Sequence, residues 1–377
     1  PPLLAAQNAT KALVLSSQCR RVLEPPREGG AGEDDRRPLN SLVAPGAEWP
    51  INCHGEAAAL CDVVRRVHKE RAVMAAVSNR NILPMLGEFV DVVQRVGVSN
   101  FLVVALDQPT AAFLQRKGAA HYVRELRSRD GSTDNHATSG LKFRILSELL
   151  SVGASVLLSD VDVVLTRDPF PALYRDSDVE GMSDGWDDDS AYGHVHELPL
   201  GATVSAEAAP LRSVRLVARN SGLFFLSSTH ESLRLMKELA RRLATEAVWD
   251  QSAYNMEIFR AAYGALGSIG ASVRTMNYLC FCNTKLLFKH MRNDAQLIDP
   301  ALHRPVTVHI NYHPEKEARM VSVSAYYHRG QRAALDKWNG GEGQRTGTCR
   351  GKVGVGGQAF SRLSADEAKS HLLAKNL

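Results

Sequence analysis

The amino-acid sequence predicts an α/β fold with one mainly parallel sheet flanked by helices. From residue 54 onward, short apolar runs typical of strands alternate with segments whose apolar residues recur at helical spacing. Strands that alternate with helices are joined by crossovers, so they pair in parallel. The composition agrees, because 44% of the 377 residues are hydrophobic and 23% are charged, which permits a sizeable core. Ligands of such sheets bind at the carboxyl ends of the strands.

The first half of the chain carries the clearest alternation. Within residues 54–70, Leu60, Val63 and Val67 lie on one helical face, and Gly118 closes a later helix. In chain order we expect helices at residues 54–70, 82–97, 109–118 and 139–154, with strands at 72–79, 100–106, 119–123 and within 157–170.

The second half continues the pattern between two tails. We expect strands at residues 178–183, 214–219, 222–227, 272–276 and 305–310, and helices at 229–246, 250–260, 314–329 and 331–338. The tract EPPREGGAGEDDRRP is rich in proline, glycine and charge and cannot bury much surface. We therefore expect a stem or linker over residues 1–47, one domain over 48–340 and a C-terminal extension over 341–377.

Two carboxylates stand one residue apart in the apolar run LLSDVDVVLTRDPF, residues 157–170. We interpret the run as a buried strand with Asp160 and Asp162 at its carboxyl end. Neighbouring carboxylates repel each other unless a cation lies between them or one of them holds a proton. A Mg²⁺ or Mn²⁺ ion bound together with a diphosphate would supply the cation, because these ions prefer oxygen ligands.

Two other interpretations fit the same pair. An apolar strand followed by Asp-x-Asp is also the nucleophile motif of haloacid-dehalogenase-type phosphatases, with Asp160 as the nucleophile. That motif normally lies on the first strand of its domain, whereas several strands precede it here. The third interpretation is a strand end with two solvated carboxylates, since an isolated Asp-x-Asp is common.

Five segments in order resemble one family: the Asp-Val-Asp run with GMSDGWDDDSAYG, ARNSGLFFLSS, VWDQSAYN and VHINYHPEKEARM. Over roughly residues 70–340 the chain resembles glycosyltransferase family 77, and more narrowly its reduced-residual-arabinose group of plant and algal extensin arabinosyltransferases. The resemblance implies a GT-A fold with a single Rossmann-like sheet, a nucleotide-sugar donor, a divalent cation and retention of anomeric configuration.

The resemblance assigns the metal site. It makes Asp162 the direct ligand and places Asp160 between the metal and the donor ribose. His309 corresponds to a late histidine ligand at a strand end, with His313 as the fallback. Carboxylates with a neutral imidazole suit Mn²⁺ somewhat better than Mg²⁺.

The resemblance also assigns donor-binding residues. Lys142, one helix before the carboxylates, corresponds to a lysine that contacts the donor, and an ordinary solvated helix lysine is the alternative. Gly222 would let the backbone approach the sugar, while a strand bulge is the other interpretation. The expected donor-binding residues are Ser78, Asn79, Arg80, Lys142, Asp160, Val161, Asn220, Ser221 and Gly222.

Two further groups of residues complete the expected site. Asp250 and Gln251 open a helix and correspond to a pair beside the anomeric carbon, although Asp250 could be only a helix N-cap. Asp184, Trp186 and Asp187 place an aromatic ring among carboxylates, which is typical of a sugar-binding surface. We predict that these three bind the acceptor, with a solvated acidic turn as the alternative.

The resemblance suggests UDP-β-L-arabinofuranose as the donor and arabinosylated hydroxyproline of an extensin-like glycoprotein or glycopeptide as the acceptor. Xylosyl or galactosyl transfer and a catalytically inactive sugar-binding domain remain open. The family's Golgi proteins are type II membrane proteins, so we expect a place in the Golgi lumen, with a membrane anchor that this chain lacks.

Charge and cysteine content set further limits. The net charge of +4, from 45 basic and 41 acidic residues, is too balanced to indicate nucleic-acid binding. Six cysteines in a chain of this size suggest an oxidising compartment with one or two disulfides. A zinc site from Cys280, Cys282, His309 and His313 is disfavoured, because Cys-x-Cys is tighter than the usual spacing.

Overall fold

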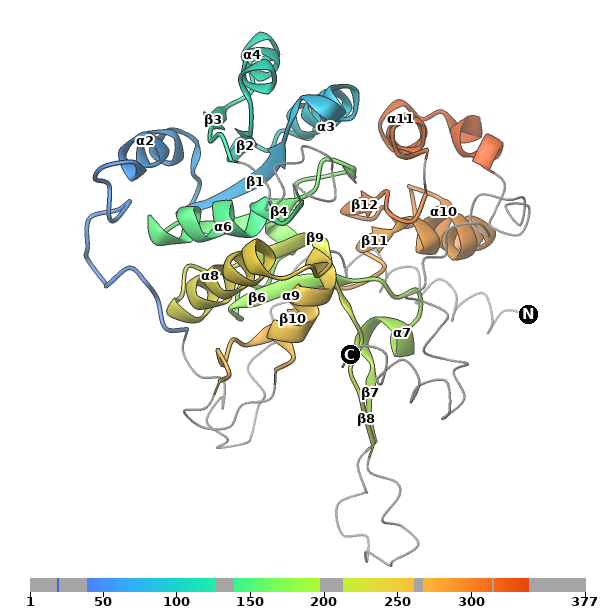
Figure 1. The fold of residues 1–377 in the computed structure, drawn as a ribbon. Coiled ribbons are helices and arrows are strands. Elements are labelled where there is room, and N and C mark those ends of the chain that lie inside the picture. The colour runs from blue at the N-terminus through green and yellow to red at the C-terminus, as the bar shows by residue number, and fades with distance from the viewer. Residues whose placement is uncertain are drawn as a thin grey trace, which may run out of the picture.

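The computed structural model describes Cys19 and residues 39–126, 139–196, 213–260, 267–313 and 315–338. A seven-stranded sheet forms its centre (Figure 1). In spatial order the strands are β10 (Val273–Thr275), β6 (Val179–Ser183), β9 (Arg219–Leu226), β4 (Ser155–Ser159), β1 (Ala72–Ser78), β2 (Phe101–Ala105) and β3 (His121–Val123). Only β9 runs antiparallel to its two neighbours, and the other pairs are parallel. The predicted mainly parallel sheet is confirmed.

Helices cover both faces of this sheet because its strands are apolar on both sides. Along β1, Val73 and Ala75 point into one core, whereas Met74 and Ala76 point into the other. The first core lies under α2 (Ala57–Val67), α6 (Leu141–Ser151), α8 (His230–Thr245) and α9 (Asp250–Ile258). The second lies under α3 (Leu83–Val96), α4 (Gln108–Arg116), α11 (Lys316–Arg329) and a small second sheet.

The second sheet has three strands in the order β11 (Phe281–Asn283), β12 (Thr307–His309) and β5 (Val163–Leu165). The predicted strand within residues 157–170 is therefore two strands in two sheets. β4 ends at Ser159, and the chain then crosses to the small sheet and enters β5 at Val163. The two carboxylates thus lie in the crossing between the sheets, where side-chain alternation along a strand does not apply.

Other segments also differ from the expectation. Residues 214–219 do not form one strand, since β8 (Ser213–Arg215) pairs with β7 (His194–His196) and β9 begins at Arg219. β9 continues through Asn220–Gly222, and its pairing with β6 shifts register at this place. Residues 331–338 form a 3₁₀ helix at Arg332–Trp338. Sequence periodicity also missed several short elements: η1 (Arg80–Ile82), η2 (Phe170–Ala172), α7 (Asp188–Tyr192), a π-helix at Leu286–His290, η5 (Met291–Asn293) and α10 (Ala295–Ile298).

Two disulfides, Cys19–Cys280 and Cys53–Cys61, agree with the expected one or two bridges, and Cys282 is a buried free thiol. The zinc interpretation is wrong because Cys280 is bonded to Cys19. Most of residues 1–47 and all of 341–377 lie outside the described ranges. Among the described residues, no helix is both long enough and apolar enough to cross a membrane.

Candidate active site

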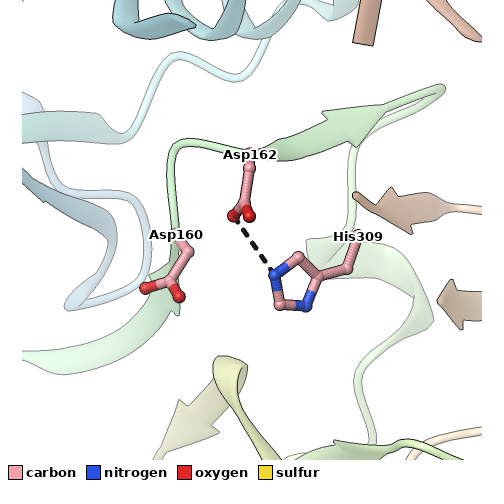
Figure 2. Close-up of side chains that lie close together, drawn as sticks. All are labelled: Asp160, Asp162 and His309. Carbon is pink, nitrogen blue, oxygen red and sulfur yellow. Dashed lines mark ion pairs between the residues drawn. The ribbon is translucent and has the colours of Figure 1, made fainter. Parts of the chain in front are cut away.

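Two carboxylates and an imidazole meet where the chain passes from one sheet to the other (Figure 2). The backbone N–H of Asp160 donates to the carbonyl of Gly222 at 2.7 Å, and the carbonyl of Asp162 accepts from Ile310 N–H at 2.8 Å. β12 is antiparallel to β5 and places His309 opposite Val163, one residue beyond Asp162. The pairing of β5 with β12 therefore brings His309 to the carboxylates.

This cluster fits a divalent cation. One ligand atom from each of Asp160, Asp162 and His309 lies within 4.8 Å of the others. The Nε2 atom of His309 is 3.1 Å from Oδ1 of Asp162. Two carboxylates and an imidazole form a donor set that Mn²⁺ accepts, and Mg²⁺ would use mainly the carboxylates. His313 is outside the cluster and packs edge-on against Phe288 instead.

Two lysines from distant helices neutralise part of the negative charge. Lys142 of α6 is only 4% exposed, and its Nζ lies 3.5 Å from Oδ1 of Asp160 and 2.9 Å from Oδ2 of Asp250. The interpretation of Lys142 as a solvated helix lysine is wrong. Lys316, the first residue of α11, places its Nζ 2.6 Å from Oδ2 of Asp162. Sequence reasoning missed Lys316, although it stands in the quoted motif VHINYHPEKEARM.

The two carboxylates differ in pKa. Burial raises the pKa of Asp162, but His309 and Lys316 outweigh burial, so the pKa lies below its ordinary value. Burial also raises the pKa of Asp160, and the neighbouring Asp162 and Asp250 carboxylates add to the rise against the effect of Lys142. Two ammonium groups thus face three carboxylates. A divalent cation would reverse this excess of negative charge.

The carboxylate of Asp184 joins three segments of the chain. Its Oδ1 accepts hydrogen bonds from the side-chain amides of Asn220 at 2.8 Å and Asn311 at 3.1 Å. Its Oδ2 accepts from Nε2 of Gln251 at 2.9 Å, and the hydroxyl of Tyr312 donates to the same carboxylate. Both carboxylate oxygens of Asp184 thus accept hydrogen bonds from the protein, and these bonds fix the positions of the donor side chains.

Asp250 and Gln251 begin α9, as predicted, and both contact β9. The Oγ of Ser221 donates to Oδ2 of Asp250 at 3.3 Å, and the backbone N–H of Ser221 donates to Oε1 of Gln251 at 3.4 Å. The N-cap residue of α9 is Trp249, and no side-chain hydrogen bond caps the helix there. Ser221 thus contacts the first two residues of α9, while Asn220 bonds Asp184 and Gly222 lies against the cluster.

The remaining predicted site residues lie in three places. Val161, which separates the two carboxylates in the sequence, is buried. Ser78 ends β1 and is buried with Asn79, whose side chain accepts a hydrogen bond from Asn81 N–H, while the backbone N–H of Arg80 donates to Asp107 at 2.9 Å. In the predicted acceptor loop, Asp187 caps α7 through a capping box with Ser190, and Trp186 stacks on His290.

Comparisons with known proteins identify the family. A family model described as nucleotide-diphospho-sugar transferase matches residues 96–321, which is more than half of the chain. The chain belongs to this nucleotide-diphospho-sugar transferase family. The resemblance to glycosyltransferases is therefore confirmed, and the phosphatase interpretation is wrong.

Curated relatives agree with this placement. Arabinosyltransferase RRA2 of Arabidopsis thaliana is 38% identical over 75% of this chain and 66% of its own length, and arabinosyltransferase RRA1 is 35% identical over 75% of this chain and 70% of its own. The chain thus spans about two thirds of these relatives. The galactosyltransferase LgtC, solved with donor and acceptor sugar analogues, is 14% identical with a TM-score of 0.41, covering 70% of this chain and 99% of LgtC.

Gly222 is expected to be irreplaceable because its hydrogen faces the cluster. A Cβ atom there would lie 2.4 Å from Cε1 of His309 and 2.8 Å from Oδ2 of Asp160. Gly222→Ala should weaken Mn²⁺ affinity by about tenfold or more, since 1.4 kcal/mol of displacement cost is a factor of ten. Calorimetric titration with Mn²⁺ measures the effect. Gly46→Ala is the control: its Cβ meets nothing within 4 Å, and although a φ of 75° strains the backbone there, Mn²⁺ affinity should stay unchanged.

Proposed function

We propose that the chain is a metal-dependent retaining glycosyltransferase that moves L-arabinofuranose from UDP-β-L-arabinofuranose to arabinosylated hydroxyproline of extensin-like glycoproteins. The observation that carries this proposal is the cluster of Asp160, Asp162 and His309 beside the buried Lys142–Asp250 pair, in a chain of the nucleotide-diphospho-sugar transferase family. The three candidate ligands lie together, which favours an active enzyme over an inactive sugar-binding domain.

The chain's own groups would act on the diphosphate in two ways. Asp160, Asp162 and His309 would hold Mn²⁺ or Mg²⁺, which would supply Lewis-acid stabilisation of the leaving diphosphate. Lys142 and Lys316 would add two positive charges at the same place. Burial lowers the pKa of Lys142, but Asp160 and Asp250 outweigh burial, so the pKa is raised and the side chain stays charged. Fixed positive charge at a developing anion lowers the barrier to leaving-group departure.

The choice of sugar rests on the relatives' names. Two curated relatives are named arabinosyltransferases, and a third, 26% identical over 49% of this chain, is named a beta-arabinofuranosyltransferase. This favours arabinofuranose over xylose or galactose as the transferred sugar. We propose that the enzyme acts in the lumen of the Golgi as a type II membrane protein. The two disulfides support an oxidising compartment of the secretory pathway.

A screen of UDP-sugars with and without Mn²⁺ tests the proposal, with thermal stability and turnover as readouts. UDP-β-L-arabinofuranose should raise the melting temperature only when Mn²⁺ is present, and sugar should appear on a hydroxyproline glycopeptide. UDP-xylose and UDP-galactose distinguish the alternative sugars. Turnover of another UDP-sugar would overturn the assignment of arabinose, and a metal-independent response would overturn the metal site.

Replacing Lys316 with methionine should separate metal binding from donor turnover. Lys316 Nζ lies 2.6 Å from Asp162 and competes with a metal for that carboxylate, so its loss should leave Mn²⁺ affinity equal or tighter. Turnover should nevertheless fall by about tenfold to a hundredfold, because one cation of the diphosphate site is gone, on the order of 1–3 kcal/mol. Calorimetry with Mn²⁺ and initial rates measure the two effects. Weaker Mn²⁺ binding with normal turnover would contradict this role. Lys337→Met, at an exposed lysine outside the cluster, is the control.

A further inference from the structure

Tyr312 presents an exposed aromatic ring beside the candidate active site. The residue is 54% exposed, although its hydroxyl donates to the carboxylate of Asp184. Its backbone φ of 63° lies in the left-handed region, which a bulky side chain seldom adopts. Residues held in such a conformation cluster at functional sites, where the surrounding contacts over-determine them. Here the hydrogen bond to Asp184 fixes the end of the side chain and leaves ring surface open to solvent.

Trp186 is the aromatic residue that the sequence suggested for the acceptor, but its ring already contacts two other side chains. The Nζ of Lys285 lies 3.3 Å from the centroid of its ring, and the ring of His290 stacks on it with an interplanar angle of 11°. A sugar would have to displace Lys285 to reach that face. The ring of Tyr312 has no such contact with a cation among the described residues.

We propose that Tyr312 is the aromatic platform on which the C–H face of the acceptor's sugar ring stacks. The inference rests on the proposed function. The hydroxyl of Tyr312 is engaged, so the ring face is what remains to recognise a ligand, and an aromatic face can stack on the apolar C–H face of a sugar ring. Asp184 accepts hydrogen bonds from both Tyr312 and Gln251, and we place Gln251 beside the anomeric carbon.

The acceptor, rather than the donor, fits this position. The donor's diphosphate belongs at the cation cluster, whose ligand atoms come from Asp160, Asp162 and His309. The acceptor must approach the bound donor from solvent, so its contacts are with groups that stay exposed until it binds. Tyr312 is such a group, and it follows His309 by three residues on the same segment. The segment is itself anchored, because Thr284 Oγ1 donates to the carbonyl of Asn311 at 2.7 Å.

Two substitutions separate the ring from its hydroxyl. Tyr312→Asn removes the ring with a residue that tolerates the left-handed backbone. Tyr312→Phe keeps the ring and removes the hydrogen bond to Asp184. Leu302→Ala is the control, since Leu302 is 42% exposed and belongs to none of the contacts described above. The probe is an arabinosylated hydroxyproline peptide, and the readouts are its Kd by calorimetry in the presence of UDP and Mn²⁺, together with the acceptor and donor KM values.

Tyr312→Asn should raise the acceptor Kd and KM by about tenfold, which is the scale of one aromatic contact. Tyr312→Phe should keep both within about threefold, and Leu302→Ala should leave both unchanged. The donor KM should stay near the wild-type value in all three variants. If thermal unfolding shows that Tyr312→Asn is not folded, Tyr312→Gly removes the ring in a residue that suits this φ.

Three results would overturn the platform. Unchanged acceptor affinity in Tyr312→Asn would show that the ring contributes nothing. An equal loss in Tyr312→Phe would assign the effect to the bond with Asp184. A rise confined to the donor KM would show that Tyr312 contacts the donor and not the acceptor. If the wild-type protein transfers no sugar to the peptide, the proposed function fails, while the Kd comparison still decides whether Tyr312 binds the glycopeptide.

Discussion

Replacement of Asp162 with alanine is expected to abolish sugar transfer and the metal-dependent part of UDP binding. Asp162 is 5% exposed, and both of its carboxylate oxygens have partners. Oδ1 lies beside His309, and Oδ2 lies beside Lys316. Without this carboxylate, the cluster retains only one carboxylate and one imidazole for a cation. Turnover should fall by at least about a thousandfold, on the order of 4 kcal/mol of transition-state stabilisation.

The fold should survive this substitution. The side chain of Lys316 is 42% exposed, so its ammonium can turn to solvent once its partner is gone. UDP titrations with and without Mn²⁺ give the decisive comparison, because the Mn²⁺-dependent gain in affinity should disappear while the metal-free affinity stays. Asp91→Ala removes an exposed carboxylate paired with Lys117 and should change neither quantity. Unchanged UDP affinity in Mn²⁺ for Asp162→Ala would remove Asp162 from the metal site.

Local sequence pattern was sufficient for most long elements of this fold. The helix predicted over residues 139–154 is α6 at Leu141–Ser151, and the strand predicted at 72–79 is β1 at Ala72–Ser78. α6 buries apolar residues at helical spacing, and β1 is a continuous apolar run because both of its sides are buried, so each carries a clear local signal. Residues 157–170 misled because the run is apolar on both sides of the carboxylates, with Leu157 and Leu158 before them and Val163–Leu165 after them. Only pairing with the distant β12 assigns the second half to another sheet, and sequence periodicity carries no information on pairing.

The candidate site shows the same limit for side chains. A helix lysine such as Lys142 looks the same in sequence whether it is solvated or buried, because its partner Asp250 lies far along the chain. Lys316 was missed for the same reason, since no local signal joins it to Asp162. The predicted acceptor role of Asp184 remains a prediction. Its four hydrogen-bond donors come from three separate segments, so its connecting role became visible only in three dimensions.

Asp250→Asn should lower turnover by about two orders of magnitude or more, roughly 3 kcal/mol, with donor binding nearly unchanged. In a retaining transfer, the carbon that loses its leaving group becomes oxocarbenium-like and needs a negative or polar partner on its opposite face. Burial raises the pKa of Asp250, but Lys142 outweighs it, so the pKa is lowered and the carboxylate is ionised at neutral pH. Asparagine keeps the shape of the side chain and removes that charge.

The geometry weakens the alternative that Asp250 is only a cap. Trp249 occupies the N-cap position of α9 and makes no capping bond, while Asp250 directs Oδ2 to Lys142 and Ser221. If capping were nevertheless its role, Asn would serve about as well as Asp, and turnover would stay near normal. Near-normal turnover in Asp250→Asn would therefore return this residue to a structural role.

Stability must be separated from chemistry in this experiment, because the Asp250–Lys142 pair is buried. Breaking a buried ion pair from one side costs about 3–5 kcal/mol of folding free energy, although Asp160 remains near Lys142 and reduces that cost. Glu257→Gln is the matched control: Glu257 is also buried on α9 and its Oε1 lies 2.7 Å from Arg242. Both variants should unfold at lower denaturant concentration than the wild type. Only Asp250→Asn should lose turnover at a temperature where both are folded, and an equal loss in Glu257→Gln would assign the effect to the helix rather than to the carboxylate.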